Sequence, residues 1–131
     1  MKAVLGLVLS CALTWSAHAA NDYPGDSGNA FVRTCSGIDR GDKDKTNVDL
    51  QKEVACVGYI SGLVDGVTAE IAFTQWEIHK NVPGPYCLPE EVENGQLIRV
   101  VLKYVKDHPE KAHMRTGPLA VLAWQKAFPC R

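Results

Sequence analysis

Apolar residues recur at helical spacing over the longest patterned stretch of the chain, from Leu50 to about His79. Side chains three or four positions apart lie on one face of a helix, so this spacing predicts one long central helix. The apolar residues of that face are Val57, Ile60, Val64, Val67 and Ile71.

Three glycines recur at every fourth residue inside this predicted helix, at Gly58, Gly62 and Gly66. They form a strip without side chains beside the apolar face. Each glycine costs about 1 kcal/mol relative to alanine in a helix interior, so three of them indicate close packing. We expect a neighbouring helix of the same fold against this strip. The alternative is a seam between two copies related by two-fold symmetry.

Shorter amphipathic stretches predict three more helices. The first begins at a cap formed by Asp26 or Ser27 and ends near Gly37. Its apolar side carries Phe31, Val32 and Cys35.

The other two helices lie in the C-terminal part of the chain. One begins at a cap formed by Asn94 and is stopped by His108 and Pro109. Its inward residues are Leu97, Val101 and Val105, and its outward residues are Arg99, Lys103 and Lys106. The last helix opens at Thr116 and Pro118. Its apolar side carries Leu119, Leu122 and Ala123, with Trp124 and Phe128 near its end.

The segments between the predicted helices have the composition of loops. Residues 39–49 are polar and charged without periodicity, and residues 82–89 hold three prolines and a glycine, which cannot continue a helix. No convincing alternating strand is present. We therefore predict an all-α fold, a small disulfide-stapled helical bundle of about four principal helices.

The first residues have the pattern of a cleaved secretory signal. Lys2 precedes an apolar stretch at residues 3–13, and Ala17, His18 and Ala19 form an A-x-A cleavage site. We expect cleavage after Ala19 or Ala20. This removes residues 1–20, leaves residues 21–131 as a single domain with one core, and places the protein outside the reducing cytoplasm. A lipoprotein signal ending at Cys11 is the disfavoured alternative, because the residues before it fit poorly.

The charge balance of the mature chain narrows the class of partner. Cleavage removes Lys2 and no acid, which leaves 13 basic and 15 acidic side chains. A near-neutral surface argues against nucleic acid, because binding of phosphates requires a concentrated basic face. No later segment avoids charge over the roughly 20 residues of a spanning helix, so we expect no membrane insertion.

Cleavage also leaves four cysteines, Cys35, Cys56, Cys87 and Cys130. An even number in an exported chain predicts disulfides. Four cysteines allow three connectivities, and the expected packing of antiparallel neighbours favours Cys35 with Cys56 and Cys87 with Cys130. Zinc is disfavoured because no C-x2-C pair is present.

A segment before the central helix weakly resembles a calcium-binding loop. Asp42, Asp44, Thr46 and Glu53 occupy ligand positions of such a loop, but Asn47 stands where the sharp turn needs glycine. We favour an ordinary solvated loop and expect no metal.

No arrangement of residues indicates catalysis. All four mature cysteines are expected in disulfides, which leaves no thiolate nucleophile. The histidines His79, His108 and His113 lack the spacing of metal ligands. We therefore expect that the protein is not an enzyme and that it binds no cofactor. An unrecognised hydrolase would require a free cysteine with a histidine beside it.

Three blocks of the sequence resemble the Tai-type immunity proteins. They are CVGYISGLVDG at residues 56–66, YCLPEEVENGQLIRVVLKYVKDHPE at residues 86–110 and AFPC at residues 127–130, so the resemblance covers nearly the whole mature chain. It implies a small helical periplasmic protein, often a homodimer. Such a protein binds a peptidoglycan amidase effector of type VI secretion and blocks its active-site cleft.

Contacts with such a partner are expected on loops, because loops held by a rigid scaffold carry most binding residues. The candidate segments are residues 79–93 and residues 107–115. Trp76 is also of a type that dominates interfaces, but we expect it in the core. The candidate partner-binding residues are Tyr86, Glu90, Glu91, Asp107, His108, Glu110, His113 and Arg115.

A different class of function remains open at this stage. A helical periplasmic module without a toxin partner would bind a small ligand or act as a chaperone for unfolded clients. It predicts a pocket of a few hundred Å³ between the apolar faces of the helices.

Overall fold

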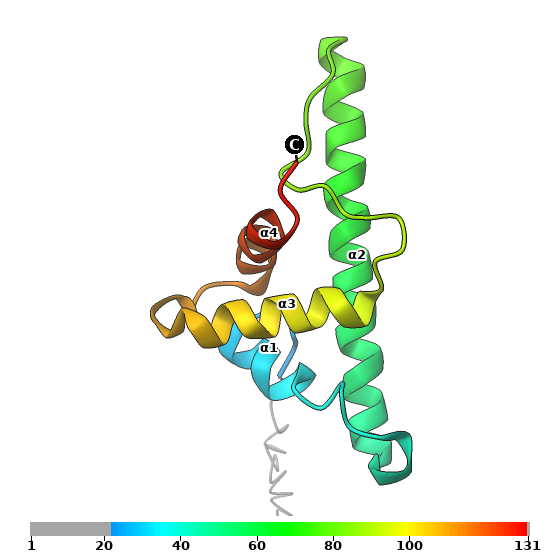
Figure 1. Ribbon diagram of the computed structural model, residues 1–131, viewed down its shortest axis with the longest axis vertical. Coiled ribbons are helices and arrows are strands. Elements are labelled where there is room, and N and C mark those ends of the chain that lie inside the picture. Colours follow the sequence, from blue (N-terminus) through cyan, green and yellow to red (C-terminus); the bar gives the residue numbers. More distant parts are fainter. Residues whose placement is uncertain (1–21, 131) are drawn as a thin grey trace, which may run out of the picture.

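Helices account for nearly all regular structure in the computed structural model, which describes residues 22–130 (Figure 1). The predicted all-α class is confirmed, since these residues contain four α-helices and no strand. The predicted signal peptide, with Cys11, lies outside the described residues. The α-helices are α1 (Gly28–Cys35), α2 (Asn47–Ile78), α3 (Asn94–Asp107) and α4 (Thr116–Ala127), and the short 3-10 helices are η1 (Asp42–Asp44) and η2 (Pro109–Lys111).

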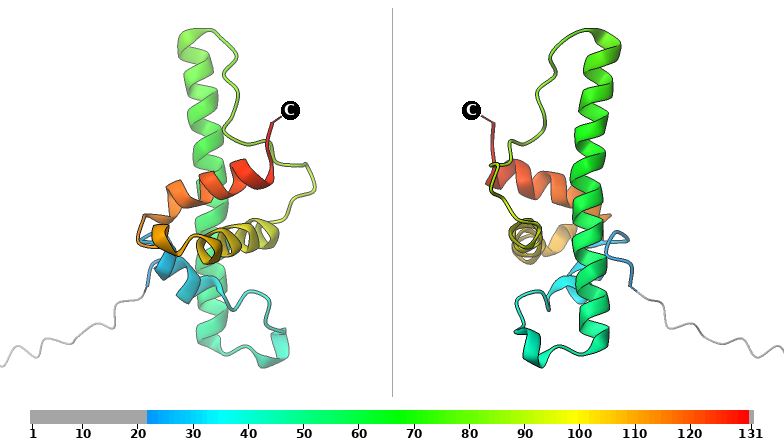
Figure 2. Two further views of the ribbon diagram at one scale, coloured as in Figure 1. Left: turned by 60° about the vertical axis from the view of Figure 1, so that its left-hand side comes forward. Right: turned by 90° about the vertical axis from the view of Figure 1, so that its right-hand side faces the viewer.

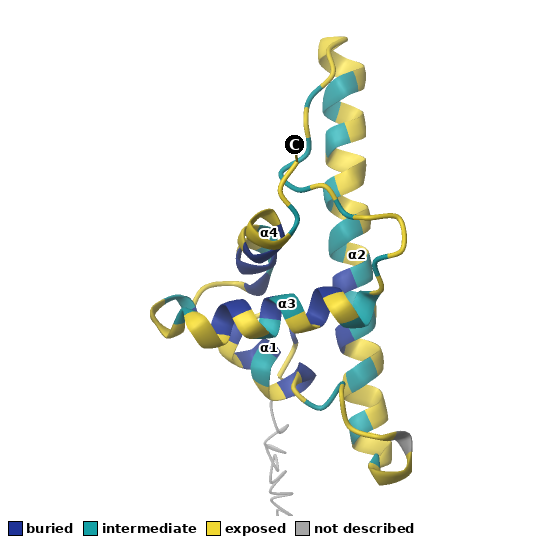
Figure 3. Ribbon diagram, in the orientation of Figure 1, coloured by how far each residue is buried: buried dark blue, intermediate teal, exposed yellow. Residues whose placement is uncertain are grey.

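Helix α2 is the longest element and extends well beyond the others. Its 32 residues span about 48 Å at 1.5 Å per residue. It begins with a capping box, in which the Thr46 hydroxyl accepts a hydrogen bond from Asp49 N and the Asp49 carboxylate accepts one from Thr46 N. These bonds to Thr46 hold the pKa of Asp49 below its ordinary value. Buried residues occur only near the middle, at Cys56 and Ile60, and both ends project into solvent (Figure 3).

Helices α1 and α3 pack on the same side of α2, and α4 packs in turn on α3 and α1 (Figures 1 and 2). Helix α3 lies in the centre of this group and contacts α1, α2 and α4. The apolar core forms where the four helices meet, and its fully buried large side chains include Phe31, Ile60, Ile98, Leu119 and Trp124.

The predicted inward face of α3 is confirmed, because Leu97, Val101 and Val105 are all buried. Asn94 was wrongly predicted as the cap: the backbone of Glu93 is extended and precedes the helix, and Asn94 is the first helical residue. The predicted start of the last helix at Thr116 is confirmed, and so is the predicted stop of the preceding helix at His108.

Leu122 was wrongly predicted to face inward on α4. Its side chain remains 38% exposed, whereas Leu119, Ala123 and Trp124 are buried. The buried residues of α4 lie on one stripe of this short helix, and Leu122 lies outside that stripe.

Both preferred disulfide pairs are confirmed. Cys35 is bonded to Cys56 with a Cα–Cα distance of 5.7 Å, and Cys87 to Cys130 with a distance of 4.9 Å. The first bond is buried and joins the end of α1 to α2. The second is exposed and joins the segment before α3 to the end of the chain.

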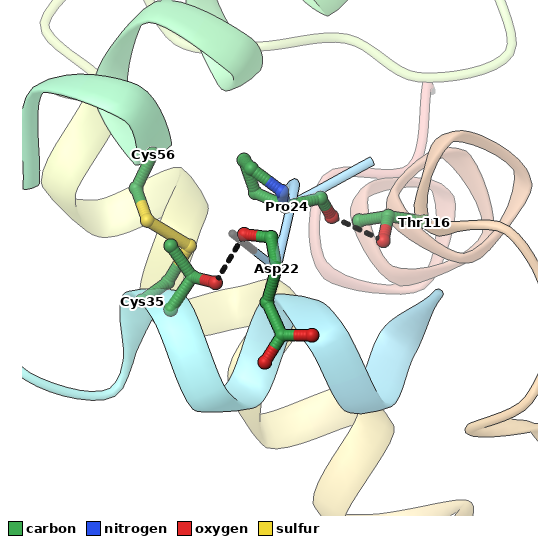
Figure 4. Close-up of a disulfide and its surroundings, with 6 residues drawn as sticks. Asp22, Pro24, Cys35, Cys56 and Thr116 are labelled. Carbon is green, nitrogen blue, oxygen red and sulfur yellow. Dashed lines mark hydrogen bonds between the residues drawn. A yellow bond between two sulfur atoms is a disulfide. The ribbon is translucent and has the colours of Figure 1, made fainter. Parts of the chain in front are cut away.

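The segment before α1 is held in the fold by two side-chain hydrogen bonds to its carbonyl groups (Figure 4). The Thr34 hydroxyl donates to the Asp22 carbonyl at 2.9 Å, and the buried Thr116 hydroxyl donates to the Pro24 carbonyl at 2.6 Å. Together they connect the start of the described chain to α1 and α4.

The Thr116→Val variant should lower the free energy of unfolding by about 1–3 kcal/mol, because the buried Pro24 carbonyl loses its donor. Valine keeps the shape of threonine, so packing is little changed. Urea denaturation measures the effect. Thr116→Ser retains the hydroxyl and serves as the control. A Thr116→Val protein that is as stable as the wild type would contradict the expected contribution of the hydrogen bond.

Candidate functional site

The predicted partner-binding residues fall into two groups at opposite ends of α3. Tyr86, Glu90 and Glu91 precede its first residue, and the others begin with its last residue, Asp107. The 14 residues of α3 separate the groups by about 20 Å. The structure therefore does not bring all of them together into one site (Figure 1).

Tyr86 packs against the core more than sequence reasoning suggested. Its ring lies edge-on to the buried Trp124 with a centroid distance of 5.3 Å. Its hydroxyl is buried without a hydrogen-bond partner, and burial raises the pKa of Tyr86. The neighbouring Glu90 and Glu91 side chains are exposed.

The second group lies on a well-anchored connection, residues 107–115, which we name the α3–α4 corner. Its backbone accepts two hydrogen bonds from the start of α1, from Gly28 N to the Met114 carbonyl at 3.0 Å and from Asn29 N to the Ala112 carbonyl at 2.9 Å. The η2 turn adds internal bonds from Lys111 N and Ala112 N. These bonds restrict the backbone of an otherwise exposed loop.

Side chains of the corner add a second layer of contacts. The His108 ring stacks on Tyr104 with a centroid distance of 4.5 Å, and the Lys111 ammonium lies 5.5 Å from the centre of the same Tyr104 ring. His108 Nδ1 lies 3.1 Å from a carboxylate oxygen of Glu110. This cluster fixes the base of the corner.

The acidic residues of the corner are charged at neutral pH. The hydrogen bond from Lys103 lowers the pKa of Asp107. A backbone hydrogen bond, followed by the contact with His108, lowers the pKa of Glu110. The tip beyond them exposes His113, Met114 and Arg115.

For the surface of α2 that faces away from the other helices, the sequence favoured burial within the fold, with a two-fold seam at the glycine strip as the alternative. Trp76 was wrongly predicted in the core, since 71% of it is exposed. It lies beside Phe73, which is 56% exposed, with the two ring centroids 6.0 Å apart. A helix of the same fold was also wrongly predicted against the glycine strip. A Cβ added at Gly58, Gly62 or Gly66 would meet no atom within 4 Å.

These exposed residues form a regular stripe. Every seventh residue along α2 is apolar or small and exposed, which keeps the stripe on one face, as in a coiled coil. We name this stripe the α2 seam; its members are Val48, Ala55, Gly62, Ala69 and Trp76. The seven-residue spacing was the signal in the sequence that could have found it.

A hollow of about 420 Å³ adjoins the N-terminal end of the α2 seam, between α1 and α2. Basic side chains on its rim come from Arg33, which is paired with Asp22 at 2.6 Å, and from Lys52. A second hollow of about 430 Å³ lies between α1 and α3. The first is lined by Asp22, Arg33, Thr34, Val48, Gln51, Lys52 and Ala55.

By length and composition alone, α2 is also apolar enough to cross a membrane. Its middle is part of the core, however, because Cys56 is disulfide-bonded to α1 and Ile60 is fully buried. Asp65 and Glu70 interrupt the apolar sequence. These features fit a helix of a folded domain with one uncovered face.

No group of three or more metal-ligating side chains occurs among residues 22–130. In the segment that resembled a calcium loop, the Glu53 carboxylate lies 2.6 Å from the Lys45 ammonium. Thr46 serves as the helix cap. Glu53 and Thr46 are thus engaged within the protein.

Comparison with known proteins adds a family to this geometry. No match was found among curated proteins or solved structures. The family model of the Rap1a immunity proteins matches residues 27–130, which include all four α-helices and both disulfides. The chain therefore belongs to the Rap1a immunity protein family.

Proposed function

We propose that this chain is a periplasmic immunity protein that binds and inhibits a peptidoglycan amidase effector of type VI secretion. The family match over residues 27–130 carries the proposal. Two disulfides support export, because such bonds persist in oxidising compartments. The amidase as the target comes from the resemblance of the sequence blocks to Tai-type proteins.

The α3–α4 corner is the surface that we propose to enter the active-site cleft of the amidase. An inhibitor needs a surface that loses little entropy on docking, and the backbone bonds from Gly28 and Asn29 supply that rigidity. The exposed tip offers Met114 as an apolar contact and Arg115 as a charged one. Arginine is among the residue types that dominate interfaces.

The test uses the mature protein as bait in periplasmic extract. The captured protein is purified and assayed for cleavage of the peptide stems of peptidoglycan. We expect this activity to fall to background at one-to-one stoichiometry. Capture of a protein without such activity, or activity that persists at equimolar amounts, contradicts the proposal.

The contact surface is tested with charge-reversal variants against the same amidase. Arg115→Glu should raise the dissociation constant by about 30-fold or more, as expected for a hot-spot residue. Lys43→Glu makes the same change of charge at an exposed position in η1 and should leave binding unchanged. Glu91→Ala probes the opposite end of α3. A larger loss for Glu91→Ala than for Arg115→Glu would move the contact to that end.

We further propose that the protein is a homodimer, as the resemblance implies. Its uncovered α2 surface supports this state, because monomers rarely expose large apolar side chains in a continuous patch. The ligand-binding or chaperone-like alternative relies on the hollow between α1 and α3, bordered by Val32, Leu102 and Val105. The family match favours the immunity reading over it.

A further inference from the structure

The α2 seam is symmetric about its own centre. Gly62 lies at the middle of α2, and the residue types on either side of it complement each other. A two-fold axis at Gly62 with antiparallel helices pairs residues that are equally far from it. The pairs are Gly58 with Gly66, Ala55 with Ala69, Gln51 with Phe73 and Val48 with Trp76.

The small residues fall where the two helices would be closest. Because a side chain at Gly62 would meet no atom of its own chain, a second backbone has room to approach there. Ala55 and Ala69 keep the approach close on both sides of the crossing. The large aromatic residues stand farther out, near the C-terminal end of the helix.

The hollow at the N-terminal end receives these aromatic residues in this arrangement. Val48 and Gln51, which line the hollow, are the positions paired with Trp76 and Phe73. Its volume of about 420 Å³ lies in the range of pockets that hold drug-sized ligands, so two adjacent rings are a reasonable fit. The nearby Lys52 ammonium can lie against an aromatic face.

The charged side chains near the two ends of α2 favour the antiparallel orientation of the helices. The aromatic end of α2 exposes Glu70 and Glu77, and the hollow at the other end carries Lys52 beside the Arg33–Asp22 ion pair. Antiparallel helices bring the glutamates of one copy to Lys52 of the other, twice by symmetry. Parallel helices would place Lys52 against its own copy, which is unfavourable.

The two aromatic side chains supply part of the area that a stable pair needs. Trp76 and Phe73 are each more than half exposed, so together they leave on the order of 250 Å² of aromatic surface uncovered in each copy. Two copies supply twice this area. A stable interface buries roughly 1,200 Å² or more in total. The rest of this area comes from the remainder of the helix, where Val48 and Val54 are also exposed.

We infer that two copies of this chain associate through antiparallel α2 helices that cross at Gly62, with Phe73 and Trp76 of each copy seated in the Arg33–Lys52 hollow of the other. The inference rests on the proposed homodimer and adds its interface and its anchor residues. It assigns the hollow to a second copy of the chain.

Cysteine cross-linking of the mature protein tests the register. Ala55→Cys and Ala69→Cys proteins are prepared separately, mixed and mildly oxidised. A disulfide-linked dimer of one copy of each variant is expected from the mixture, and far less from either variant alone. Gly62→Cys should cross-link to itself. Thr68→Cys lies on the flank of the same helix and is the matched control, which should not cross-link.

The anchor residues are tested by sedimentation of the same protein. Trp76→Ala should raise the dimer dissociation constant by about 30-fold or more, as truncation of a hot-spot residue does. Leu122→Ala removes an apolar side chain that is exposed on α4 and should leave the constant unchanged. Circular dichroism verifies that each variant is folded.

The outcomes separate the inference from the proposed function. A dimer in which Ala55→Cys links to itself, or in which the mixture gives no more product than Thr68→Cys, overturns this interface while the homodimer stands. A monomer at every concentration overturns both. A monomer that binds lipid vesicles, or that cross-links through Ala55→Cys to the captured amidase, assigns the seam to that occupant instead. Inhibition of the amidase is measured independently of all of these.

Discussion

The Trp124→Ala variant should lose about 3–5 kcal/mol of stability, the usual cost of removing a large aromatic side chain from a core. Trp124 is completely buried, and its indole nitrogen donates a hydrogen bond to the Leu97 carbonyl at 3.2 Å. Its ring also supports Tyr86. Because small domains have only about 5–15 kcal/mol of net stability, the variant should be partly unfolded at physiological temperature.

Thermal and urea denaturation measure this loss. Leu122→Ala is the matched control on the same helix, where truncation of a side chain that is 38% exposed should cost much less. Near-ultraviolet circular dichroism reports whether Tyr86 loses its ordered environment. Equal destabilisation by the two variants would show that α4 is not held mainly by Trp124.

Removal of the buried disulfide has the second-largest expected effect. Replacing Cys35 and Cys56 together by alanine should lower the free energy of unfolding by about 3–4 kcal/mol, because the unfolded chain regains the freedom of a closed loop. The sequence separation of this pair is 21, and both side chains lie in the core. Urea denaturation under oxidising conditions is the measurement.

The second disulfide differs from the first because its cysteines are accessible to solvent and to reducing agents. Cys87 and Cys130 are exposed, so dithiothreitol should reduce their bond in the folded protein while the Cys35–Cys56 bond persists. Mass spectrometry after thiol alkylation follows both bonds. Simultaneous reduction of the two bonds under native conditions would mean that the core opens more readily than its burial suggests.

Local patterns in the sequence were sufficient for most of the fold. The spacing of Leu97, Val101 and Val105 identified the buried face of α3, since only one face of that helix is apolar. The caps and prolines located most helix boundaries, apart from the one-residue error at Asn94 and the start of α2, which begins at Asn47 and not at Leu50. The even number of cysteines and the expected order of the helices gave the correct disulfide pairs.

The same reasoning failed on α2 because that helix is apolar nearly all round. Periodicity identifies residues that avoid water, but it does not distinguish burial within a chain from burial between chains. Trp76 and the glycines therefore looked like core residues. Ile60 was placed correctly because it lies where α1 and α3 cross the helix.

The candidate contact residues were predicted from loops and residue types alone. Both candidate segments, residues 79–93 and residues 107–115, have the composition of exposed connections. Nothing in the sequence shows how far apart α3 places them or which way each one faces. Only the structure reveals that Tyr86 supports the core while Arg115 is exposed at a tip. The anchoring of that tip depends on backbone bonds from α1, which no side-chain pattern encodes.

The order of the disulfides along the chain bears on how the protein would mature after the proposed export. The first of the four cysteines in the described chain is bonded to the second, and the third to the fourth, so the two covalent loops follow one another without overlap. An oxidase that joins cysteines in the order in which they cross the membrane produces the native connectivity directly. The slow reshuffling of wrong pairs, which thiol–disulfide exchange would otherwise have to complete, is then unnecessary. Under the proposed export and immunity function, the protein would become competent soon after its last residues reach the oxidising compartment.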